Sequence, residues 1–95
     1  MAKQCFVVQS GNNSVEVFEA DTQDGRQRML RWVEKRVGGS FSSHEKMLAS
    51  RIMEGDFSQF SSTVKAGYNV PVVFFSEKKN HRAINVVLGT FGEPA

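Results

Sequence analysis

Few residues in this chain have side chains that could perform covalent or metal chemistry. Cys5 is the only cysteine, and His44 and His81 are the only histidines among 95 residues. A zinc site usually takes paired ligands a few residues apart, whereas these three residues are widely separated. A nucleophilic cysteine needs a neighbouring base, which no spacing here indicates. We therefore interpret Cys5 as a small buried hydrophobic residue and expect no metal ion.

The carboxylates have structural explanations of their own. Asp21, Asp24, Glu45 and Asp56 all fall where helices are expected to begin, and acidic side chains there cap free N–H groups or interact favourably with the helix dipole. No pair of carboxylates stands in an apolar context that would suit general acid–base catalysis. The sequence also lacks the glycine patterns that bind nucleotide phosphates. It therefore predicts a non-enzymatic protein without catalytic residues or cofactors.

One predicted helix, spanning residues 24–37, carries a basic face. At about 100° per residue, apolar and basic side chains fall on opposite arcs of this helix. The apolar arc consists of Met29, Leu30, Val33 and Val37. The basic arc consists of Arg28, Arg31 and Lys35, with Trp32 on the flank between the two arcs. Because arginine binds phosphates and carboxylates in bidentate geometry and tryptophan can anchor a protein partner, these four residues are the first candidate partner-binding surface.

A second basic cluster lies in a predicted hairpin turn. It consists of Lys78, Lys79 and Arg82, with His81 between them. Two interpretations of the basic clusters stay open. They can be ordinary solvated faces, with Trp32 as half-buried core, or they can contact phosphates or an acidic protein surface. The periodicity does not determine whether the two clusters share one side of the fold.

Composition and charge indicate a small folded protein of the cytoplasm. The chain has a net charge of +2, 40% hydrophobic residues and 23% charged residues, which is ordinary for a soluble domain. It lacks the large basic excess of a dedicated nucleic-acid-binding protein. A single cysteine fits a reducing compartment, no signal-peptide pattern is present, and no apolar run approaches the ~20 residues of a membrane span. We expect one domain over residues 1–95, a disordered tail over residues 92–95, and no membrane partner.

Alternating and apolar segments towards both ends of the chain predict four strands. Residues 4–9 and 14–20 flank a Ser-Gly-Asn-Asn turn, and residues 70–75 and 83–91 flank a polar turn. Each pair of segments predicts a β-hairpin. Since an isolated hairpin is barely stable in water, we expect the two hairpins to share one four-stranded antiparallel sheet.

Two helices are expected directly after the first hairpin. Asp21 is the expected N-cap of the first helix, and Gly38 follows its last turn, where a left-handed residue commonly ends a helix. Ser42 and Glu45 have the spacing of a capping box. They predict a second helix that runs to about residue 54.

A third, shorter helix is expected before the second hairpin. Asp56 would cap it, Gly67 would end it, and Phe57, Phe60 and Val64 would share one of its faces. The predicted fold is therefore α+β, with element order ββαααββ and the helices packed mainly on one face of the sheet.

The expected strands carry more apolar side chains than one covered face can bury. We expect one parity of residues 70–75 to face the helices, namely Val70, Val72 and Phe74. Val73 and Phe75 would then lie on the other face with Val7, Cys5 and Val87. Such a patch is uncommon on a monomer and marks an interface. Either the helices split across both faces and cover it, or the sheet pairs with another copy or with a partner, which we favour.

Two functions follow as hypotheses. The first is a non-enzymatic protein that docks on a protein or nucleoprotein partner. Small phage or mobile-element proteins that inhibit or adapt host machinery, such as anti-CRISPR inhibitors, are similar in size and composition, although no motif carries that resemblance. The second is a nucleic-acid-binding domain that contacts phosphates through the basic helix face, independently of base sequence and with steep salt dependence. A homodimer through the sheet face is compatible with both.

Overall fold

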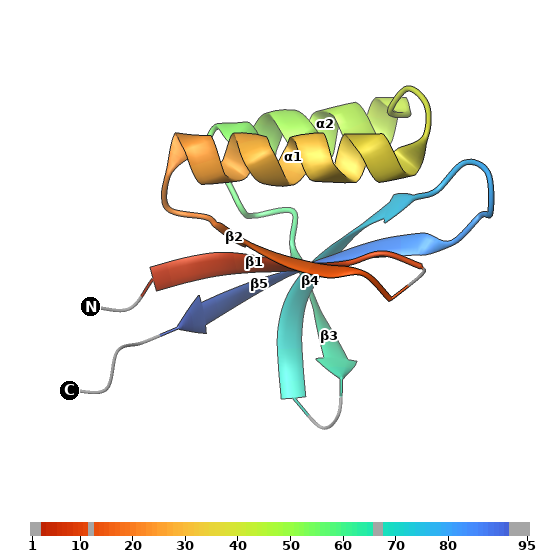
Figure 1. The fold of residues 1–95 in the computed structure, drawn as a ribbon. Helices are drawn as coiled ribbons and strands as arrows, with labels where there is room; N and C mark the ends of the chain where they lie inside the picture. Colours follow the sequence, from red (N-terminus) through yellow and green to blue (C-terminus); the bar gives the residue numbers. More distant parts are fainter. Residues whose placement is uncertain (1–2, 12, 66–67, 92–95) are drawn as a thin grey trace.

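The computed structural model describes residues 3–11, 13–65 and 68–91, and shows two helices on one face of an antiparallel sheet (Figure 1). The strands are β1 (Lys3–Gln9), β2 (Val15–Glu19), β3 (Ser61–Lys65), β4 (Tyr68–Ser76) and β5 (Ala83–Phe91). The helices are α1 (Gln23–Val37) and α2 (Ser43–Met53). The strand order across the sheet is β2-β1-β5-β4-β3. The α+β class, the four predicted strands and the single helical layer are confirmed.

The expected third helix is wrong, and a fifth strand takes part of its place. Asp56 does not start a helix, and its carboxylate accepts a hydrogen bond from the Ser58 amide at 3.0 Å in a local turn. Phe57 and Phe60 instead pack their rings on Phe6 in the core, with centroids 5.5 and 6.1 Å away. The next residues, Ser-Ser-Thr-Val-Lys, form β3 and pair with β4. The described element order is ββααβββ, and the expected helix end at residue 67 lies outside the described residues.

The faces of β4 are the reverse of those expected. Val73 and Phe75 pair with Val86 and Ile84 of β5, and all four are buried beneath the helices. Val73 and Phe75 therefore belong to the core and cannot line an open apolar face. The residues on the opposite face are Val70, Val72 and Phe74, and Phe74 is 50% exposed. Because both parities of this segment are apolar, alternation alone could not decide which one the helices cover.

α1 begins after a threonine N-cap and ends at a glycine. Thr22, not the expected Asp21, is the N-cap of α1, and its hydroxyl accepts a hydrogen bond from the Gly25 amide at 3.0 Å. The Asp21 carboxylate instead accepts from the Gln4 amide at 3.0 Å. Gly38 has a φ of 71° and ends α1 in the left-handed conformation, as expected.

Glu45 connects the start of α2 to the sheet. Its carboxylate completes the predicted capping box by accepting from the Ser42 amide at 2.9 Å, while the Ser42 hydroxyl accepts from the Glu45 amide at 3.2 Å. The second carboxylate oxygen accepts from the Ser76 amide at the end of β4, at 2.9 Å. Glu45 is only 7% exposed. One buried carboxylate therefore fixes both the helix terminus and its position over β4.

Arg26, at the start of α1, links this helix to the end of β2 and to the end of α2. Its guanidinium donates to the Ala20 carbonyl at 2.9 Å and to the Met53 carbonyl, at the last turn of α2, at 3.4 Å. The neighbouring residue, Gly25, is buried against the end of β2, where a Cβ atom would collide with the Glu19 carbonyl oxygen. α1 can approach β2 this closely only because residue 25 has no side chain.

We predict that Gly25→Ala destabilises the protein, although alanine ordinarily favours a helix by about 1 kcal/mol over glycine. The added methyl group meets backbone atoms that cannot rotate away, so α1 must shift, at a cost of about 1–3 kcal/mol. Urea unfolding followed by circular dichroism measures this change. An unchanged or raised midpoint would contradict the close packing of α1 on β2.

We also predict that Glu45 makes stability depend on acidic pH. Burial raises the pKa of this carboxyl, but hydrogen bonds from Ser42 and Ser76 and the charge of Lys78 outweigh burial and lower the pKa overall. The stabilisation is therefore complete above the unfolded pKa of about 4.3 and is lost as the pH falls through the lower folded pKa. Glu45→Gln should be less stable by about 1–2 kcal/mol at pH 7. This difference should shrink at pH values where wild-type Glu45 is protonated, and a difference that stays constant down to pH ~2 would rule out the linkage.

Candidate partner-binding surfaces

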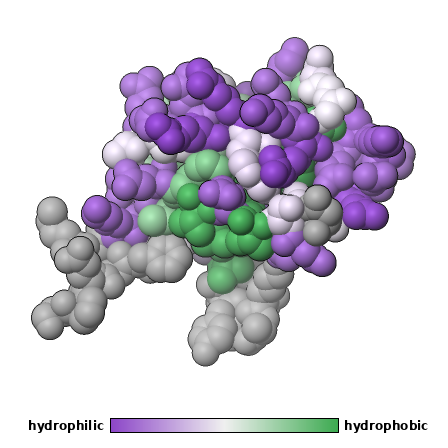
Figure 2. All heavy atoms as spheres, in the orientation of Figure 1, coloured by the Kyte–Doolittle hydropathy of each residue, from purple (hydrophilic) through white to green (hydrophobic). Residues whose placement is uncertain are grey.

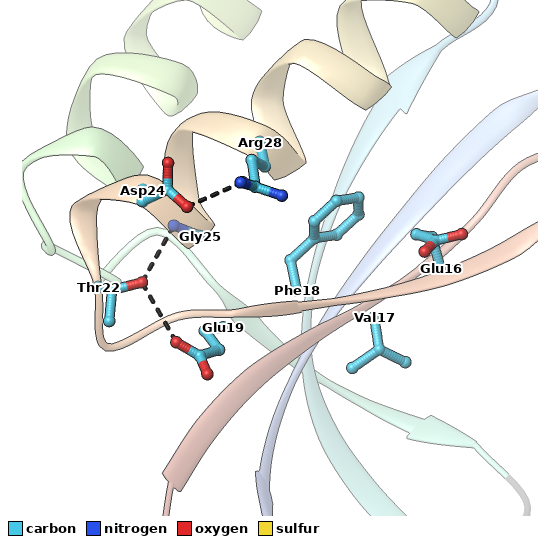
Figure 3. A pocket seen from close by; sticks show the side chains of 8 residues that line it. All are labelled: Glu16, Val17, Phe18, Glu19, Thr22, Asp24, Gly25 and Arg28. Carbon is cyan, nitrogen blue, oxygen red and sulfur yellow. Dashed lines mark hydrogen bonds and ion pairs between the residues drawn. The ribbon is translucent and has the colours of Figure 1, made fainter.

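The cations of α1 do not form one free cluster. Arg28 pairs with Asp24 at 2.8 Å on the exposed surface. This pair lies beside a hollow of about 370 Å³ between β2 and the first turns of α1. Figure 3 shows Phe18 pointing from β2 towards α1 beside it. Arg31 and Lys35 are exposed and make no ion pair among the described residues. Of the three predicted basic residues, two therefore keep an unneutralised charge.

Trp32 is part of the packing rather than a free anchor. Its ring meets the Phe18 ring edge-on at a centroid distance of 6.2 Å. On its other side, the Arg36 guanidinium carbon lies 3.5 Å from the Trp32 ring centroid, in cation–π contact. Trp32 is only partly exposed. The sequence reasoning missed Arg36, and the signal was the four-residue spacing between the two side chains, which places them on neighbouring turns.

The hairpin tip between β4 and β5 lies against two other parts of the chain. The Lys78 amide donates to the Val37 carbonyl at 3.0 Å, which places the tip at the C-terminal end of α1. The Arg82 guanidinium donates to the Gly11 carbonyl at 3.2 Å, in the turn between β1 and β2. Lys78, Lys79 and Arg82 are all exposed. Arg28 lies nine residues before Val37, about 14 Å along the helix, whereas Lys35 is in the last turn of α1, at the same end as the hairpin tip.

A groove runs between α1 and α2 on the surface that faces away from the sheet. It has a volume of about 450 Å³. Its apolar lining comes from Leu30, Phe41, Ala49 and Met53. Its polar lining comes from Gln27, Arg31 and Glu34 of α1 and from Lys46 of α2. Of the predicted basic residues, only Arg31 lines this groove, and it faces Lys46 from the opposite helix. Each helix thus contributes a cation beside a shared apolar floor.

The face of the sheet opposite the helices is apolar, and we call it the outer face. Its centre is a transverse row of four valines, which pair directly across four strands: Val17, Val7, Val87 and Val72. Val17 is 55% exposed, and Val15 and Phe74 on the same face are 53% and 50% exposed. Val7 and Val87 are partly exposed, and Val72 is 5% exposed. Figure 2 shows hydrophobic residues gathered over the strands, beneath a largely hydrophilic helical layer. Val7, predicted to line an apolar face away from the helices, lies on this outer face.

The described residues offer no arrangement suited to metal binding, since nowhere among them do three His, Cys, Asp or Glu side chains gather. No helix within residues 3–11, 13–65 and 68–91 is long and apolar enough to cross a membrane. Comparisons with protein-family models, with curated proteins and with solved structures find no match. The chemical character of the groove and of the outer face is therefore the basis for inferring function.

We predict that Trp32→Ala destabilises the protein by about 2 kcal/mol, because it removes the contacts with Phe18 and Arg36. Arg31→Ala, one residue away and fully on the surface, should change stability by less than about 0.5 kcal/mol. Thermal unfolding of both variants measures the difference. Equal stability of the two variants would mean that Trp32 is not held by these contacts.

Proposed function

We propose that this protein is a non-enzymatic docking protein, which binds an acidic segment of a partner protein in the groove between α1 and α2. The observation that carries the proposal is the apolar floor of the groove with a cation on each of its two helices, Arg31 and Lys46. An apolar side chain of the partner would fill the floor, and acidic side chains beside it would meet the two cations. An inhibitor or adaptor of cellular machinery needs no more than such a contact.

The charge and shape of the groove support this class of partner. Arg31 and Lys46 outweigh the single carboxylate of Glu34, so the groove carries a net positive charge. Phe41, Ala49 and Met53 are partly exposed, so their remaining apolar surface is available to a partner. Binding pockets combine such apolar area, which supplies affinity, with a few polar groups that fix orientation. A helix or turn with one apolar anchor between acidic residues matches both features.

A sequence-independent nucleic-acid-binding domain is the second candidate. The observation in its favour is that Arg31 and Lys35 are exposed without an ion pair among the described residues. Against it, the Arg28 charge is paired with Asp24. Phosphate binding needs cations rather than an apolar floor, so the groove has no role in this alternative.

Two matched variants distinguish these functions, because Arg28 and Arg31 are exposed arginines one turn apart on α1. Arg31→Gln removes a cation of the groove, whereas Arg28→Gln removes one outside it. Immobilised wild-type protein would first be used to isolate the partner from host lysate, with and without nuclease. We expect Arg31→Gln to weaken the affinity for that partner about fivefold or more, and Arg28→Gln to leave it within about twofold.

Other outcomes argue against the groove. Three results would support nucleic-acid binding instead. They are loss of the bound material on nuclease treatment, a similar effect of both variants, and a slope of about −2 to −4 when the logarithm of affinity is plotted against the logarithm of salt concentration. Retention of the partner by Arg31→Gln with unchanged affinity would mean that the groove is not the docking site. Both variants should unfold at the wild-type temperature, since each replaces an exposed side chain.

A further inference from the structure

We infer that the outer face of the sheet binds the outer face of a second copy of this chain, forming a symmetric dimer. This inference goes beyond the proposed function, because it concerns the face opposite the α1–α2 groove. It begins from the valine row, in which residues of β2, β1, β5 and β4 pair directly across the sheet. Such a row places branched side chains next to one another across the sheet, and two sheets can pack face to face at about 10 Å separation.

The charges of the outer face favour a copy of the same chain. Among its described side chains, only Lys3 and Glu19 are charged, and their charges are opposite. In a two-fold symmetric contact, each surface meets itself, so a strongly charged face would repel its copy. The described charges of this face therefore cancel, which lets the valines approach. Among the described side chains, the face has no excess positive charge to attract the phosphates of a nucleic acid.

The area of the outer face is enough for a weak dimer. Four strands spaced about 4.8 Å apart and seven residues long, at about 3.3 Å per residue, cover roughly 450 Å² in projection. Standard stable interfaces bury about 800 Å² of accessible surface on each partner, and weak or transient interfaces bury less. The corrugated side-chain surface exceeds its projection, so the face falls in the range of weak dimers. We therefore expect dissociation in the micromolar range.

The arrangement of the layers shows what the dimer would do for docking. Both helices lie on the face opposite the contact (Figure 1), so two sheets would be sandwiched between two outer helical layers. The two α1–α2 grooves would stay open and point in opposite directions. Two partner molecules, or two sites on one assembly, could then be held at once, and the combined avidity would exceed that of a single groove.

Sedimentation equilibrium from about 5 to about 500 µM tests the dimer. We expect the measured mass to rise with concentration from 10.6 kDa towards twice that value. Cys5 is the only cysteine and lies partly exposed on the outer face, two residues from Val7. Its rate of alkylation by iodoacetamide should therefore fall about threefold or more over the same range, as the dimer covers it. A mass that stays at the monomer value with a constant alkylation rate would overturn the inference.

Substitutions at Val17 locate the interface. Val17→Lys places two charges in a symmetric contact and should shift the dissociation constant about tenfold or more towards monomer. Val17→Thr keeps the branched shape and should have a smaller effect. Arg31→Gln, on the helical side, should leave the dimer unchanged. A dimer that survives Val17→Lys would place the contact elsewhere and overturn the inference.

The same variants separate this inference from the proposed function. Val17→Lys should still bind a partner in its groove, whereas Arg31→Gln should still dimerise. If the chain is a monomer whose partner is lost in Arg31→Gln, the docking function stands and the dimer does not. If the chain dimerises but Arg31→Gln binds its partner normally, the dimer stands and the docking site does not. Unfolding temperatures of both variants show that neither result reflects loss of the fold.

Discussion

Both helices of this protein come from the single connection between β2 and β3, and this connection allows them to cover only one face of the sheet. Figure 1 shows α1 and α2 side by side above the strands. Phe6, Val8, Phe75, Ile84 and Val86 are completely buried beneath them. The other connections between strands span only a few residues, too few to carry a helix across the opposite face. Among the described residues, the helical layer therefore covers one face of the sheet only.

This arrangement needs the helical layer to keep a fixed position over the sheet. Arg26 joins the start of α1 to the last turn of α2, while Glu45 joins the start of α2 to the end of β4. The Lys78 amide binds the carbonyl of Val37, the last residue of α1. These polar contacts lie at helix ends, where backbone groups otherwise lack partners. They hold the two helices at the spacing that forms the groove.

Local signals in the sequence were sufficient for most elements but not for the assignment of faces. The capping box at Ser42 and the glycine after α1 predicted helix ends correctly, because those interactions are made within a few residues. The helix expected after Asp56 failed, since the spacing of Phe57 and Phe60 reflects packing on Phe6 from a loop. The reversed faces of β4 have a related cause. Burial of Val73 and Phe75 depends on helices distant in sequence, and no local pattern records it.

The candidate surfaces were predictable to a smaller extent. Arg31 was identified correctly as exposed and basic, but the groove beside it depends on how α2 packs against α1, which periodicity does not determine. Trp32 looked like an anchor because its contact with Phe18 joins α1 to β2, which spacing within the helix does not show. The apolar outer face was predictable as a surplus of valines. Which valines it contains required the strand register.

The bond from the Ser76 amide to Glu45 has a consequence for the free edge of the sheet. β3 pairs with β4 only as far as Val72, so the described residues after Val72 have no strand beside them on that side. Open edges recruit strands from other chains and lead to aggregation, and charged groups placed there prevent this. The Glu45 carboxylate occupies the position that an incoming strand would need for Ser76. The residue that caps α2 therefore also occupies one backbone donor at the open edge of a valine- and phenylalanine-rich strand.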